Sequence, residues 1–192
     1  DSLKLLQTLY EKDCLTQLES WDRLLSKLLA NQGQAVLEWM KRPTSSNYSH
    51  VLRALAKEGD NSSETESLFR RWQESNNQEE SEDSLLVVNM YTSVIIGWSK
   101  TGNVERTLAW YDEWSQTTTP NIPPPTRTVQ TAVLSAYTQA NDAHGAEAFL
   151  RQLEEQAQKG HASSPPDVVM YNIVLNAWAK AKNGSRARQL LE

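Results

Sequence analysis

The sequence repeats itself at a nearly constant period, and this repetition constrains the fold more than any other feature. The block YTSVIIGWSKTGN at 91–103 aligns without a gap with YNIVLNAWAKAKN at 171–183, and weaker copies begin at Tyr48 and Gln130. The polar residue after the first position of each copy marks steps of 43, 39 and 41 residues: Ser49, Thr92, Thr131 and Asn172. A period of this length is typical of proteins built from stacked helical pairs.

The last copy, at 167–192, has the pattern of two helices joined by a short turn. Its apolar residues recur at three- and four-residue spacing, which places them on one helical face: Val168, Tyr171, Val174, Leu175 and Trp178. Asp167 precedes them, where its side chain can cap the free amide groups of the helix. Asn183-Gly184 supplies the turn, since both residues tolerate a left-handed backbone. One such hairpin cannot bury its apolar face alone, so the sequence predicts an all-α solenoid of helix-turn-helix repeats.

The copies divide the chain into consecutive segments. Residues 1–44 show two helices without the tyrosine register, and we expect them to form N-terminal helices of a degenerate repeat. The predicted repeats then follow at 45–87, 88–126, 127–167 and 168–192, the last of them incomplete. The first of these contains an acidic loop at 74–84. Because solenoids normally end in capping elements, we expect the sequence to belong to a longer chain.

Composition limits the kinds of partner that the chain can have. The net charge is −5, the mean hydropathy is −0.62, and no apolar run approaches the ~18 residues of a membrane-spanning helix, so we expect no membrane span. The excess acid is concentrated in one loop: Glu74, Glu79, Glu80, Glu82 and Asp83. Without those five acids the net charge is zero, so the acidity says little about the charge of the helical faces.

No group of residues has the spacing of an active site or a metal site. The histidines, His50, His144 and His161, lack the pairing that a metal site or a nucleophile needs, and the single cysteine, Cys14, excludes a disulfide framework and a cysteine-rich zinc site. The glycines are expected to lie in turns, so no phosphate-binding loop is predicted. Glu154-Glu155 is expected to be solvated. We therefore expect no catalysis, no metal and no cofactor.

Two sets of polar residues recur in register with the repeats. One set consists of small hydrogen-bonding residues and the other of long polar residues about two turns further on: Ser49, Thr92, Thr131 and Asn172, then Lys57, Lys100, Gln139 and Lys180. A polar ladder beside a lysine ladder suits a single-stranded nucleic acid, whose bases it can hydrogen-bond and whose phosphates it can neutralise. Short polar residues could equally fit a crowded seam between helices, and spacing alone leaves both interpretations open. The tryptophans Trp98 and Trp178 align with Leu55 and Tyr137, which favours core positions over base stacking.

At these residues the sequence resembles the pentatricopeptide-repeat family. The stretch DVVMYNIVLNAWAKAKNG is similar to that family's motif, and the junction between motifs is present as Pro166-Asp167-Val168 followed by Tyr171-Asn172. The resemblance covers residues 45–192 and is strongest in the fourth repeat, then in the second. It implies a right-handed superhelix of helical hairpins that binds single-stranded RNA, one base per repeat, in mitochondria or chloroplasts.

The resemblance also implies roles for individual residues. In that family the fifth and last residues of a motif read the edge of a base, and the second residue packs against bases. The fifth positions here are the four small polar residues, the second positions are Ser46, Asn89, Thr128 and Val169, and the last positions are Val87, Thr126 and Asp167. The pair Thr131 with Asp167 matches a family pairing associated with guanine, and Asn172 suits a pyrimidine.

The expected function is therefore RNA binding in organellar RNA processing, stability or translation, without catalysis and without DNA as a partner. One alternative is a scaffold that contacts protein subunits within a large organellar complex, such as a ribosome or a membrane assembly. The acidic net charge favours the scaffold, whereas the polar and lysine ladders favour RNA. Another is that the repeats target an enzyme whose catalytic domain follows Glu192.

Overall fold

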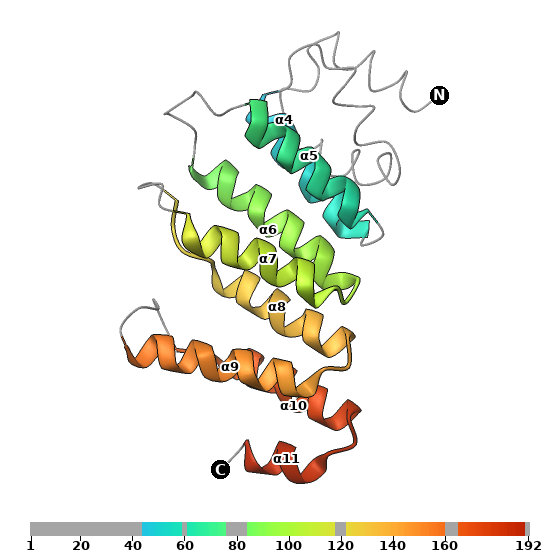
Figure 1. Ribbon diagram of the computed structural model, residues 1–192, viewed down its shortest axis with the longest axis vertical. Coiled ribbons are helices and arrows are strands. Elements are labelled where there is room, and N and C mark those ends of the chain that lie inside the picture. The colour runs from blue at the N-terminus through green and yellow to red at the C-terminus, as the bar shows by residue number, and fades with distance from the viewer. Residues whose placement is uncertain (1–43, 59–60, 76–83, 118–121, 160–164, 191–192) are drawn as a thin grey trace. The chain divides into compact units, whose positions relative to one another are not determined.

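The computed structural model describes residues 44–58, 61–75, 84–117, 122–159 and 165–190. These residues form helices and no strand, so the predicted all-α class is confirmed for the described part of the chain (Figure 1). The helices are α4 (Ser45–Glu58), α5 (Ser62–Ser75), α6 (Ser84–Lys100), α7 (Val104–Gln116), α8 (Arg127–Gln139), α9 (Ala143–Gln158), α10 (Val168–Lys180) and α11 (Gly184–Gln189). The predicted helices of residues 1–44, most of the acidic loop, Cys14 and His161 lie outside the described residues. The repeat boundaries themselves stay a prediction.

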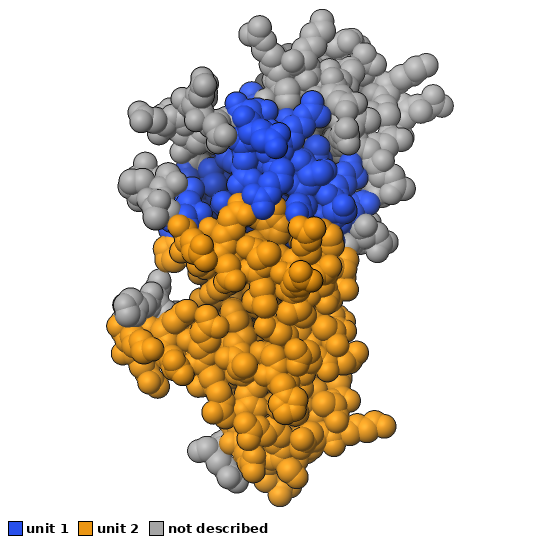
Figure 2. All heavy atoms as spheres, in the orientation of Figure 1, with its two compact units in different colours: residues 1–97, 117–123 blue, residues 98–116, 124–192 orange. Residues whose placement is uncertain are grey.

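The chain divides into two compact units, which Figure 2 shows in different colours. One unit comprises residues 1–97 and 117–123, and the other comprises residues 98–116 and 124–192. In the first unit, α4 and α5 form an antiparallel hairpin whose apolar side chains are fully buried. The ring of Tyr91 on α6 meets the ring of Phe69 edge-on, with centroids 4.8 Å apart. A helix of the following pair thus closes the core of the hairpin before it.

The same arrangement is repeated within the second unit. There α8 packs against α7, α9 and α10, so that it is enclosed by its own partner helix and by both neighbouring pairs (Figure 1). Aromatic side chains fill the space between α7 and α9, because the ring of Tyr111 meets that of Phe149 edge-on at 5.3 Å. Trp178, on α10, is only 2 % exposed, which confirms the prediction that this tryptophan belongs to the core.

Three turns between paired helices follow one rule, which corrects the predicted turn at Asn183-Gly184. The left-handed residue is the one before the helix cap: Gly102, Asn141 and Lys182 have φ angles of 71°, 58° and 56°. The next residue then caps the second helix, and Asn183 accepts a hydrogen bond from the Arg186 amide at 3.1 Å. Gly184 is simply the first residue of α11. The prediction was therefore one residue late, since a lysine adopts the conformation that was assigned to asparagine and glycine.

Gly97 lies within α6 and Gly145 within α9, so the expectation that the glycines lie in turns is wrong for these two. Close packing at Gly145 generates a prediction about stability. A Cβ atom at this position of α9 would collide with the ring of Tyr137 and with the carboxylate of Asp142, the residue that caps α9. We expect overpacking in Gly145→Ala to destabilise the fold by about 1–3 kcal/mol. The better helix propensity of alanine offsets up to about 1 kcal/mol of this loss. Urea denaturation followed by circular dichroism measures this difference.

Gly97→Ala is the matched control. In α6 a Cβ atom at Gly97 would meet Ser62 at an ordinary 3.7 Å, so this variant gains helix propensity without a collision. Equal unfolding midpoints for the two variants would contradict the packing described at Gly145.

Candidate nucleic-acid interface

One face of α10 is exposed along its whole length. Val169, Asn172, Asn176 and Lys180 follow one another at three- and four-residue steps, so they form one stripe on the helix surface. The opposite face is buried by Met170, Val174, Ala177 and Trp178. The stripe therefore presents an apolar group, two amides and an ammonium group in that order, beginning at the N-terminal end of the helix.

The exposed valines correct part of the predicted apolar face. Val168 was expected to be buried with Tyr171 and Trp178, but it is 73 % exposed, and Val169 is 55 % exposed. Met170 occupies the buried position in the first turn instead. Exposed apolar side chains of this size are costly to hydrate, and two of them adjoin the predicted base-reading residues Asp167 and Asn172.

A second stripe of polar side chains lies on α8, which packs against α10. It consists of Thr128, Thr131, Ser135 and Gln139, all of them exposed or half-buried. The Thr131 hydroxyl donates to the Arg127 carbonyl oxygen at 2.9 Å, and the Ser135 hydroxyl donates to the Thr131 carbonyl oxygen at 2.9 Å. Because each hydroxyl hydrogen is used within the helix, the oxygens offer acceptor lone pairs to a ligand.

Asp167 joins the N-terminal ends of these two helices. Its Oδ1 accepts the Met170 amide at 3.1 Å, so the predicted cap of α10 is confirmed. Its Oδ2 accepts from Nη1 of Arg127, the first residue of α8, at 3.2 Å. Both oxygens of the predicted base-reading carboxylate thus have a protein partner, and Thr131 lies one helical turn beyond Arg127 on α8.

The other predicted RNA-binding residues differ from one another in solvent exposure. Ser49 is 6 % exposed, and Thr92 is half-buried on α6. The lysines Lys57, Lys100 and Lys180 are exposed, each in the last turn of its helix, where a positive charge is also favoured by the helix dipole. Ser49, Thr92 and Lys57 belong to the first unit, whereas the stripes on α8 and α10 belong to the second. A single ladder through all of these residues stays a prediction.

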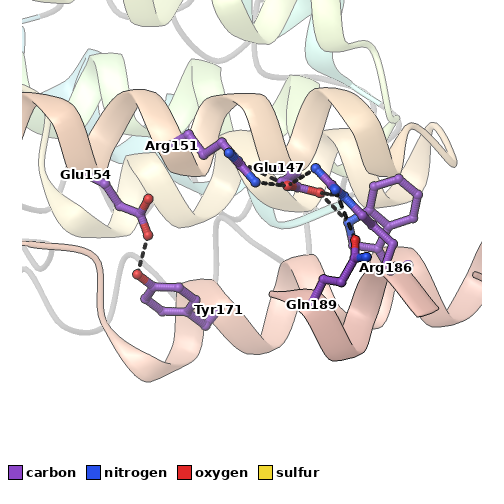
Figure 3. A network of polar contacts seen from close by, with 7 residues as sticks. Glu147, Arg151, Glu154, Tyr171, Arg186 and Gln189 are labelled. Carbon is purple, nitrogen blue, oxygen red and sulfur yellow. Dashed lines mark hydrogen bonds and ion pairs between the residues drawn. The ribbon is translucent and has the colours of Figure 1, made fainter. Parts of the chain in front are cut away.

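The orientation of α10 depends on a buried carboxylate that the sequence did not reveal (Figure 3). Glu147 of α9 is only 4 % exposed. Its oxygens accept hydrogen bonds from Nε and Nη2 of Arg186 on α11 at 3.0 and 2.8 Å, and from Nε1 of Trp178 on α10 at 2.9 Å. Arg151, one turn further along α9, donates to the same carboxylate at 2.7 Å. One side chain therefore connects three helices.

These partners keep Glu147 ionised. Burial alone would raise the pKa of the Glu147 carboxyl, but the hydrogen bonds from Arg186 and Arg151, together with the charge of Arg186, hold the pKa below its ordinary value. The spacing of Glu147 and Arg151 is a sequence signal for an ion pair on one helix. Nothing local signals Arg186, since it lies 39 residues away.

A second polar contact holds the other end of α10. The Tyr171 hydroxyl donates to Oε1 of Glu154 on α9 (Figure 3). This hydrogen bond, and then burial, raises the pKa of the Tyr171 phenol. Glu154 was expected to be solvated like its neighbour, which is wrong for Glu154. Glu155 is exposed and meets Lys159 at 3.6 Å.

The described residues contain no group of three or more histidine, cysteine, aspartate or glutamate side chains placed to hold a metal ion. Within the same ranges no helix has the length and apolarity that crossing a bilayer requires.

Comparisons with known proteins show what the helical pairs are similar to. The family model described as PPR repeat matches residues 90–116 and 169–192. The crystal structure of the pentatricopeptide repeat protein PPR10 in complex with an 18-nt psaJ RNA element superimposes with a TM-score of 0.55 at 16 % identity. A form of PPR10 with three cysteine-to-serine substitutions, bound to the same element, gives the same values. The likeness confirms the expected fold class.

The superposition covers very different shares of the two chains. The superposition covers 99 % of this chain but only 31 % of the PPR10 chain, so this chain spans about a third of the length of the structure it resembles. No curated protein matches the sequence.

The Glu147 contacts predict a stability that depends on pH. Glu147→Gln should lower the free energy of unfolding by about 1–3 kcal/mol at neutral pH, because a buried acceptor loses its charge-assisted partners. Since the folded-state pKa of Glu147 is depressed, the stabilisation is present at neutral pH and is lost as the pH falls through that folded-state pKa. Thermal unfolding across acidic to neutral pH should show the two proteins converging in acid.

Glu155→Gln is the control, because it breaks an exposed ion pair on the same helix, worth about 0–1 kcal/mol. If both variants lose the same stability at neutral pH, the Glu147 contacts do not hold the three helices together.

Proposed function

We propose that this chain is a pentatricopeptide-repeat protein and that it binds single-stranded RNA along the stripes of α8 and α10. The observation that supports this most directly is the exposed face of α10, where Val169, Asn172 and Lys180 follow one another. The three groups suit the three parts of a nucleotide: an apolar contact for the base plane, an amide for the base edge, and a cation for the phosphate.

The proposed roles follow the family resemblance residue by residue. Thr131 and Asp167 read one base, with guanine as the expected match, because a carboxylate accepts hydrogen bonds from the donors on the guanine edge. Asn172 contributes to reading the next base, with a pyrimidine expected. Val169 packs against the bases, and its 55 % exposure means that such contact would remove apolar surface from water.

Local charge supports an anionic ligand despite the acidic chain. Residues 168–190 contain no acidic side chain and four basic ones: Lys180, Lys182, Arg186 and Arg188. Arg186 is held by Glu147, which leaves three exposed cations around the turn between α10 and α11. Phosphate binding there would release counterions and would therefore weaken as salt is added.

The biological role that fits this activity is RNA processing, stability or translation in mitochondria or chloroplasts. In this role the repeats position or protect RNA, and they carry out no catalysis of their own. Lys57 and Ser49 on α4, with Thr92 and Lys100 on α6, extend the proposed binding set along the chain.

A protein ligand is the second candidate. The net charge of −5 and the burial of Ser49 favour it, because they weaken the case for RNA contacts at the first predicted repeat. In that case the helical face would hold another subunit of an organellar complex.

A titration with labelled single-stranded RNA of random sequence tests the proposal. Fluorescence anisotropy at ~50 and ~200 mM salt should show binding that weakens steeply with salt, as expected for counterion release. Lys180→Gln should reduce the slope of log K against log salt by about 0.7, the value for one phosphate contact to a single strand.

Lys159→Gln serves as the control, since it removes one exposed positive charge from the C-terminal cap of α9, outside both stripes. It should leave the slope unchanged. Absence of binding at the lower salt would overturn the proposal in favour of the protein ligand, and equal slopes for all three proteins would exclude Lys180 as a phosphate contact.

A further inference from the structure

The two oxygens of Asp167 have different partners, and this asymmetry bears on how the carboxylate can be used. Oδ1 accepts the Met170 amide and caps α10. Substituting an N-cap of this kind by alanine typically costs about 1 kcal/mol, so the Oδ1 contact is part of the fold. Oδ2 accepts from the guanidinium of Arg127 at 3.2 Å. A base that reads Asp167 at Oδ2, the oxygen that the cap does not use, meets the guanidinium of Arg127 there.

We infer that Arg127 restrains base reading by Asp167, acting as a specificity-determining residue that competes with the base for the carboxylate oxygen. The inference rests on the proposed function, because it has meaning only if the stripes bind RNA. A guanine offers N–H donors on its Watson–Crick edge, and a carboxylate accepts them strongly when no other cation neutralises its charge. Arg127 supplies a rival donor together with a positive charge, so it weakens this acceptor.

The solvent exposure of the Arg127–Asp167 ion pair determines how strongly Arg127 can lower the preference for guanine. The side chains of Arg127 and Asp167 are 50 % and 30 % exposed, and they meet at 3.2 Å. Ion pairs of this kind contribute little, so a base can displace the guanidinium. The restraint therefore lowers the preference for guanine by about two- to fivefold and does not abolish it.

The position of Arg127 on α8 explains why it would affect only the base that Thr131 and Asp167 read. Arg127 precedes Thr131 by one turn of α8, and the Thr131 hydroxyl bonds to the Arg127 carbonyl oxygen. The guanidinium thus lies on the side of the helix that carries the proposed base-reading pair. Lys159, the C-terminal cap of α9, pairs instead with Glu155.

The test compares base preference between variants of the whole chain. An RNA is selected from a random single-stranded pool with the unaltered protein, and each of its positions is then replaced in turn by each of the other bases. Arg127→Gln should raise the ratio of guanine to adenine affinity at one position by about two- to fivefold. Arg127→Lys, which keeps the charge, should stay near the original ratio, and Lys159→Gln should not change it.

Asp167→Asn completes a double-mutant cycle with Arg127→Gln. Asparagine also caps helices well, so the fold should survive this substitution. In the Asp167→Asn protein, Arg127→Gln should leave the ratio unchanged, because the carboxylate for which the arginine competes is absent. Circular dichroism of every variant confirms that it is folded.

Each other outcome has a distinct meaning. If the ratio is unchanged in Arg127→Gln while RNA still binds, the inference is wrong and the proposed function stands. If the ratio falls, Arg127 itself reads the base and the restraint is again excluded. If the unaltered protein binds no RNA, the proposed function fails and the inference fails with it.

Discussion

Each helical pair in this chain has more apolar surface than it can bury by itself, and the rest of the structure follows from that constraint. α8 is enclosed by α7, α9 and α10, and α10 packs against α8, α9 and α11. A first helix placed in this way has only one narrow face left for solvent. On α10 that face begins at Val169 and ends at Lys180, so the packing of the core fixes where the polar stripe can lie.

The polar contacts of α10 set its rotation more sharply than apolar packing can. Glu147 holds Trp178 and Arg186, and Glu154 holds Tyr171 at the other end of the helix. Both acceptors belong to α9, the second helix of the preceding pair. Since hydrogen bonds are directional and apolar contacts are not, these bonds fix the register of α10, and thereby the positions of Asn172 and Lys180 relative to α8.

The features that the sequence predicted well are local ones. The helix that follows Asp167, its cap, and the buried Trp178 all depend on residues within a few turns of one another, and the structure confirms them. The errors lie where two local signals compete. Val168 and Met170 are both apolar, and only the neighbouring helices decide that Met170 is buried. Asn183 caps α11 with its side chain, so the left-handed turn position falls to the residue before it, Lys182.

The features that the sequence could not predict are contacts over long separations. Arg186 meets Glu147 across 39 residues, and Arg127 meets Asp167 across 40. No local pattern marks either pair, because each forms only when separate helices are brought together. The predicted roles of Thr131, Asp167 and Asn172 came from the family resemblance, and the structure adds to them the partners that share or restrain these groups.

The central claim is that the exposed stripes of α8 and α10 contact RNA. Labelling with a lysine-acetylating reagent, followed by mass spectrometry with and without single-stranded RNA, tests it directly. Lys180 and Lys159 are both exposed, but only Lys180 lies on a stripe. Protection of Lys180 by RNA, with Lys159 still reactive, is the expected result. Protection of Lys159 while Lys180 stays reactive would place the RNA elsewhere and contradict the account.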